Sequence, residues 1–250
     1  MSRLFGLCLA ALSCLVVPLA SAVPAQDGGE TELYFRAQVV IDADGSIGAI
    51  AWEPERRIPE VLGEKLERQI RTWQFAPGSV DGEPAETRTT LQLRLTATPA
   101  TDGDAYEVRV DHAQTGPSLA RSTFPGYPPK ALRHGAMARV VADLRVEADG
   151  SREIALLQYD GRREYRNAFE KATTDYLEQV EVAFEQVGGH AADAGFVVPV
   201  TFCLNGPCHT DPVPGTDRGS SLPTAAFAPG EPLPQGSVAR LLTDVRGTAI

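Results

Sequence analysis

The chain has 250 residues and a formal net charge of −10. This length indicates either two small domains or one large domain. The negative charge argues against a nucleic-acid partner, because a polyphosphate would be repelled.

The N-terminus has the pattern of a secretory signal peptide. Arg3 precedes an apolar run over 4–17, Pro18 interrupts it, and Ala20-Ser21-Ala22 supplies the small residues that a signal peptidase accepts. We therefore expect residues 1–22 to be removed, with a mature protein that starts at Val23 and works in the periplasm.

Two alternatives to cleavage remain open. An uncleaved anchor is one, although the run is shorter than the ~20 residues that span a bilayer. A lipoprotein attached through Cys14 is the other, but Ala11-Leu12-Ser13 lacks the aliphatic residue usual three positions before such a cysteine. No later stretch is apolar enough to cross a membrane, so no stable insertion is expected after cleavage.

The first predicted unit covers 35–95. Apolar and polar residues alternate over 35–41 and 47–51 around Asp44-Gly45, which predicts a β-hairpin. Helical periodicity follows after Pro54, with Pro59 in the first turn, and ends at Pro77 and Gly78; alternation returns over 88–95. The predicted order is β-β-α-β.

A second copy of this pattern covers 140–202. Alternation over 140–147 leads through Asp149-Gly150 into 154–159, a helical stripe extends from Tyr165 to Val180, and a last strand covers 196–202. We therefore predict an α+β fold of two tandem β-β-α-β two-layer units, each a small antiparallel sheet with one covering helix.

The segments outside these repeats complete the predicted organisation. Alternation over 106–111 predicts a fourth strand, hairpinned onto the first sheet after the turn at 101–104. The expected domains are 23–112, 113–210, and a Pro/Gly-rich tail over 211–250. Within this tail, Ser237–Arg246 is expected to form either one amphipathic helix or a frayed end.

Two cysteines remain after the leader, Cys203 and Cys208, separated by Leu-Asn-Gly-Pro. In an oxidising compartment this spacing favours a disulfide that closes a tight turn. The adjacent His209 raises a metal site as the alternative, yet a structural zinc site needs about four such ligands and none is near in sequence. We expect no metal and no cofactor.

Two short stretches carry a family resemblance. The first is Trp73-Gln74-Phe75-Ala76-Pro77, followed by Asp81-Gly82-Glu83-Pro84. The second extends from Pro125 through Tyr127 and Pro128 to Gly135 and precedes the second unit. Together they resemble the C-terminal domain of TonB, the periplasmic part of a bacterial energy transducer, with its signatures split between two copies.

From the residues alone, the rings of Trp73 and Phe75 are expected to pack at the helix–strand junction, and Pro77 to stop the helix. Tyr127-Pro128-Pro129 predicts an extended entry before a helical turn at 130–133.

The resemblance implies a function in transport across the envelope. TonB-like domains capture short receptor segments by strand addition, so we expect a module that binds an extended peptide or protein partner, such as an outer-membrane receptor segment. The edge expected to bind it is the last strand of the second unit, with Phe196, Val198, Val200 and Phe202, although Pro199 removes one donor there.

Three other functions remain as alternatives. A membrane-anchored energy transducer requires an uncleaved leader, and this leader lacks the family's histidine and long Pro/Lys-rich spacer. A structural or regulatory protein without peptide binding is favoured by the fourth strand, which can occupy a free edge. An enzyme is not expected, because the four histidines stand singly and neither a nucleophile elbow nor a phosphate loop occurs.

Overall fold

The computed structural model describes residues 29–54, 58–100, 105–120, 124–204 and 231–250. The expected signal peptide, its cleavage site and Cys208 lie outside these residues. Among the described helices, none has the length and apolar character needed to cross a membrane.

The larger sheet forms around a long central strand. β1 (Thr31–Ile41) pairs with β2 (Ile47–Trp52) on one side and with β6 (Thr87–Pro99) on the other, and all the pairings are antiparallel. β7 (Tyr106–Gly116) continues from β6, which confirms the predicted fourth strand. The first hairpin is also confirmed, because Gly45 adopts a left-handed φ of +83° at its turn.

One helix packs on this sheet. α1 (Glu60–Ile70) begins directly after Pro59, whose fixed φ suits a helix start. Leu66 and Ile70 are fully buried against inward-facing strand residues such as Leu91 and Leu93, and Trp73 and Phe75 close the core.

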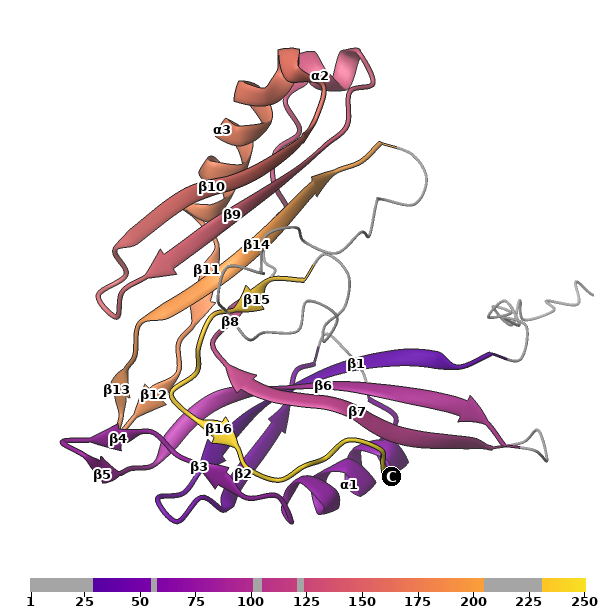
Figure 1. The fold of residues 1–250 in the computed structure, drawn as a ribbon, viewed down its shortest axis with the longest axis vertical. Coiled ribbons are helices and arrows are strands. Elements are labelled where there is room, and N and C mark those ends of the chain that lie inside the picture. Colours follow the sequence, from indigo (N-terminus) through magenta and orange to yellow (C-terminus); the bar gives the residue numbers. More distant parts are fainter. Residues whose placement is uncertain (1–28, 55–57, 101–104, 121–123, 205–230) are drawn as a thin grey trace, which may run out of the picture.

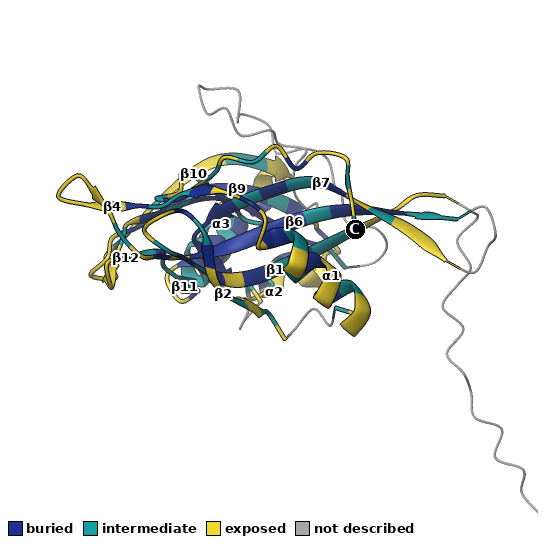
Figure 2. Cartoon of the chain, turned by 90° about the horizontal axis from the view of Figure 1, so that it is seen from below, coloured by how far each residue is buried: buried dark blue, intermediate teal, exposed yellow. Residues whose placement is uncertain are grey.

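The segment after α1 differs from expectation. The helix ends at Ile70 with Arg71 as its C-cap, so Pro77 does not stop it. Three two-residue strands follow instead: β3 (Phe75–Ala76), β4 (Ser79–Val80) and β5 (Glu83–Pro84). β4 and β5 form an exposed hairpin tip, whereas β6 behind them is largely buried (Figure 2).

The smaller sheet has the order β10-β9-β14-β15. β9 (Ala138–Val146) pairs with β10 (Arg152–Gly161) and with β14 (Ala194–Phe202), and β15 (Leu233–Pro234) adds to the far side of β14. α2 (Pro129–Arg133) precedes the sheet and confirms the predicted helical turn. A 3₁₀ turn (Arg163–Tyr165) leads into α3 (Arg166–Leu177), whose Phe169 is fully buried in a second core.

The predicted fold class is wrong. Of the described residues, 49% are in strands and 17% in helices, and several further sheets accompany the two large ones. β12 (Gln186–Val187) and β13 (His190–Ala191) follow the second helix yet join the first sheet through β6. β8 (Ser118–Ala120) pairs with β11 (Glu181–Ala183) between the sheets. The chain therefore does not divide into two β-β-α-β units with one covering helix each.

The C-terminal segment is the second departure from expectation. Residues 231–250 form neither a helix nor a frayed end, but an extended segment that we call the strap. Its three short strands are β15 on β14, β16 (Arg240–Leu241) on β3 and β17 (Thr248–Ala249) on β7. Figure 1 shows it in yellow, extending from the smaller sheet to the larger one.

Candidate functional site

The edge that the sequence predicted for binding is β14. Its residues Phe196, Val198, Val200 and Phe202 are at most 4% exposed and form part of the second core. They cannot contact a ligand without unpacking that core. β15 already pairs with Phe196 and Val197, and Gln235 N–H donates to the Gly195 carbonyl, so the strap covers the first part of this edge. From Val198 onward, no described strand pairs with the outer side of β14.

A longer open edge belongs to β10, the outermost strand of the smaller sheet (Figure 1). Within the described ranges, β9 is its only ladder partner over ten residues. Glu147 N–H donates to the Ser151 carbonyl, so these two residues form a hydrogen-bonded pair at the start of the ladder. In an antiparallel ladder every second residue bonds to the partner strand, so the backbone groups of Ile154 and Leu156 point away from β9. Those N–H and C=O groups are available to another strand.

Two neighbouring leucines mark the middle of this edge. Leu156 is 39% exposed and Leu157 is 55% exposed, at a β-bulge that shifts the register between Leu156 and Gln158. Leu156 lies opposite Ala142 and so shares the face that carries the second core. A strand added to β10 would cover both leucines.

Several other outer strands of the two large sheets also have a single partner in the described part of the chain, and β2 is the longest of them. It is six residues long, and its exposed positions are Gly48, Ala49 and Ala51. These small side chains offer little apolar area, so β2 is a poorer docking edge than β10.

The residues of the family-like motifs are structural in this fold. Trp73 and Phe75 are 2% and 1% exposed, which confirms their predicted packing role. Pro77 follows β3 and is half-buried. β3 also pairs with strand β16, so the first motif is one of the places where the strap docks.

The second motif packs the smaller sheet against α3. The ring of Tyr127 makes edge-to-face contacts with Phe169 and Phe202, each at 5.7 Å between centroids. Its hydroxyl donates to the Ala136 carbonyl. Pro125 lies in the extended entry, Pro128 is the N-cap of α2, and Gly135 takes a φ of +58° that suits glycine.

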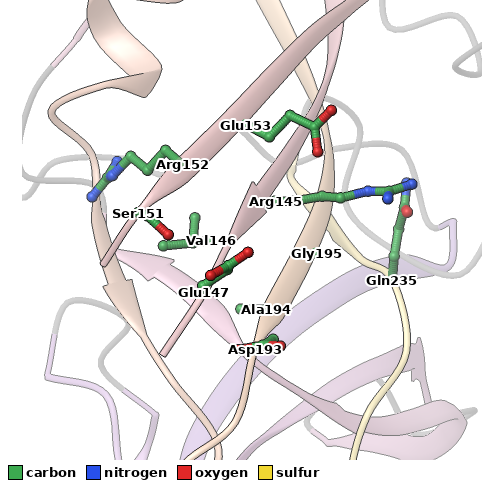
Figure 3. Close-up of a pocket in the computed structure, with 10 residues that line it drawn as sticks. All are labelled: Arg145, Val146, Glu147, Ser151, Arg152, Glu153, Asp193, Ala194, Gly195 and Gln235. Atoms are coloured by element: carbon green, nitrogen blue, oxygen red, sulfur yellow. The ribbon is translucent and has the colours of Figure 1, made fainter. Parts of the chain in front are cut away.

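A polar pocket of about 530 Å³ lies beside the open edge, at the β9–β10 hairpin (Figure 3). Several of its charged groups are already engaged. Both Arg152 amino groups donate to the carbonyls of Leu177 and Val180, which closes the C-terminus of α3. Asp193 accepts the Ala148 N–H, while Glu153 lies across the ladder from Arg145.

The pocket lining contains no histidine or cysteine: its residues are Arg145, Val146, Glu147, Ser151, Arg152, Glu153, Asp193, Ala194, Gly195 and Gln235. Its mixed charges suit polar contacts to a ligand more than nucleophilic chemistry.

Elsewhere the titratable groups are dispersed. No group of three or more metal-ligating side chains occurs among the described residues. His134 Nδ1 lies 2.5 Å from the Tyr165 hydroxyl, and His190 is exposed in β13. Burial lowers the pKa of His112, against a hydrogen bond to Gln114 that raises it. Cys203 is disulfide-bonded, and its predicted partner Cys208 lies outside the described ranges.

No known family model, curated protein or solved structure matches this chain. The resemblance to TonB C-terminal domains therefore rests on the two motifs and stays a prediction.

Proposed function

We propose that this protein is an exported, periplasmic binding module that takes up an extended segment of a partner protein by strand addition at β10. The observation that carries the proposal is the open side of β10, where outward backbone groups run beside the exposed Leu156 and Leu157.

Three features support β10 as the docking strand. Main-chain hydrogen bonds to an edge supply affinity for an extended peptide, and neighbouring pockets supply its specificity. The polar pocket begins at the Arg152 end of β10, so a strand added there would place one end beside it. The strap also shows that the opposite edge of the same sheet accepts an added extended segment. The docking edge is thus β10 rather than β14, whose predicted residues are core residues.

The location and the link to outer-membrane transport rest on the sequence. The leader pattern at 1–22 supports export, and the TonB-like motifs support a receptor segment as the partner. A structural or regulatory role is the second candidate, favoured by the strap, which pairs with β7 at Arg109 and Val110 and so occupies part of that edge.

Proline variants of the mature protein test the proposal. Leu156→Pro removes an outward amide without breaking the β9 ladder, and Leu156→Ala removes the side chain alone. Ile50→Pro is the matched control, since the ladder of β1 and β2 directs its amide outward at the open edge of β2.

Each variant is first checked for native circular dichroism and then used to capture partners from an envelope fraction. Capture should be lost with Leu156→Pro, reduced with Leu156→Ala and kept with Ile50→Pro. Equal capture by all three variants would sink strand addition at β10.

A further inference from the structure

The strap contacts both sheets through an ion pair and side-chain hydrogen bonds as well as through short ladders. At its start, the Glu231 carboxylate forms an ion pair with Arg36 on β1, and both side chains are largely buried. At its centre, Glu185 is 3% exposed and holds the strap from the other side. At its end, Gly247 N–H and Ile250 N–H donate to the carbonyls of Val110 and Val108.

Glu185 holds the centre of the strap through hydrogen bonds. Its Oε1 accepts hydrogen bonds from the hydroxyls of Thr89 and Ser237 at 2.5 Å and 2.6 Å. Its Oε2 accepts one from the Val238 N–H at 2.9 Å. One buried carboxylate therefore binds a strand of the larger sheet and the strap together. Such charge-assisted bonds fix the register of an extended segment more than apolar contact does.

Two glycines on the strands beneath the strap leave room for it. A Cβ on Gly116 would lie 3.1 Å from the ring of Pro234, and one on Gly195 would lie 3.4 Å from the Cβ of Gln235. These glycines let the strap approach the backbones of β7 and β14 closely. We call the surface that holds the strap the track. Its contacts select an acidic residue, then Leu-Pro, then a residue whose N–H can donate to Glu185.

The strap itself adds little apolar surface. Its buried apolar side chains are small or medium in size, namely Leu233, Pro234, Ala239 and Val245, and each of its three ladders is two residues long. Segments held by few apolar contacts and short ladders open at lower free energy than a core strand.

We propose that this track is a second strand-addition site, in which residues 231–250 are an exchangeable occupant. Its other occupant is an extended partner segment with the same chemistry, an acid two residues before Leu-Pro and a small residue five positions after that proline. This site is separate from the β10 edge, so either proposal can fail alone.

Covalent attachment favours the strap over any free segment. A tethered segment acts at an effective concentration of the order of millimolar, so a free peptide of equal affinity at ~10 μM would lose about a hundredfold. The test therefore uses the full chain with a protease site introduced within 211–230. Cutting after folding removes the tether and leaves every described residue in place.

The probe is a fluorescent peptide of residues 231–250, added to the cut protein. The cut strap should stay bound at high concentration and exchange with the peptide. A Val238→Pro peptide loses the N–H that Glu185 accepts, so it should bind at least about tenfold more weakly. A Leu242→Ala peptide is the control, because that side chain is 53% exposed, and it should bind like the native peptide.

Two results would overturn the proposal. One is a cut strap that leaves only when near-ultraviolet circular dichroism shows global unfolding, since it would then be an inseparable part of the core. The other is equal binding of the native and Val238→Pro peptides, which would mean that the peptide does not occupy the track.

Discussion

Removing either charge of the Arg36–Glu231 pair is expected to destabilise the fold strongly. The two side chains are only 12% and 7% exposed, and they join β1 to the start of the strap. Breaking a buried pair by deleting one partner costs about 3–5 kcal/mol, because the other charge stays buried without compensation. With a urea m-value of about 1–3 kcal/mol/M, Arg36→Leu should lower the unfolding midpoint by at least about 1 M.

A double variant distinguishes the contribution of the ion pair from the cost of leaving one charge buried alone. Arg36→Leu with Glu231→Leu removes both charges, and similar replacements elsewhere have been neutral or stabilising by about 1–4 kcal/mol. We therefore expect the double variant to unfold at a higher urea concentration than either single variant. Arg109→Leu is the control, because the Arg109–Glu30 pair is 48% and 63% exposed and should change stability by less than about 1 kcal/mol.

Urea titration of the full chain, followed by tryptophan fluorescence, measures all four proteins. Single-variant losses no larger than that of Arg109→Leu, or a double variant whose loss is the sum of the single losses, would refute the reasoning. The strap would then not depend on this ion pair.

Two further predictions concern buried polar groups. Thr173 is fully buried in α3, and within the described structure its hydroxyl has no hydrogen-bond partner. Thr173→Val should therefore leave the unfolding free energy unchanged or raise it by about 1 kcal/mol in urea titration. A loss of more than about 1 kcal/mol would contradict this prediction. Burial lowers the pKa of His112 below its ordinary 6.5, so below that pH the unfolded chain binds a proton that the folded chain excludes. Stability should therefore fall as the pH drops through 6.5 toward the lowered pKa, and His112→Gln should flatten the curve of urea midpoint against pH over this range; an unchanged curve would contradict this.

Local signals in the sequence located the long elements. The Asp44-Gly45 and Asp149-Gly150 turns form as expected, since Gly45 and Gly150 take φ values of +83° and +89°. The apolar spacing of Leu62, Leu66 and Ile70 also marks a real helix. These features succeed because turn chemistry and periodicity depend on neighbours in sequence.

The fold class failed because its deciding contacts are non-local. Two-residue strands such as β12, β15 and β16 are too short to show a period, yet they link the sheets. Proline and glycine at the start of the strap predicted an extended tail, and the apolar spacing in 237–246 predicted a helix or a frayed end. The strap's order comes from partners such as Arg36 and Glu185, which no pattern within 231–250 reveals.

The candidate site was missed for a related reason. Alternation in 196–202 indicates a strand with one apolar face, but it cannot say whether that strand lies inside the sheet or at its edge. The adjacent Leu156 and Leu157 break the alternation of β10, which was the available signal of a bulge. Only the sheet order places these leucines at an open edge.

Amide hydrogen exchange on β10, with and without a captured partner, tests strand addition most directly. The amides of Ile154 and Leu156 face away from β9, so they should exchange quickly in the free protein and be protected in the complex. The amide of Ala155, which belongs to the β9 ladder, should change little. Unchanged exchange at Ile154 and Leu156 in a saturated complex would contradict binding at this edge.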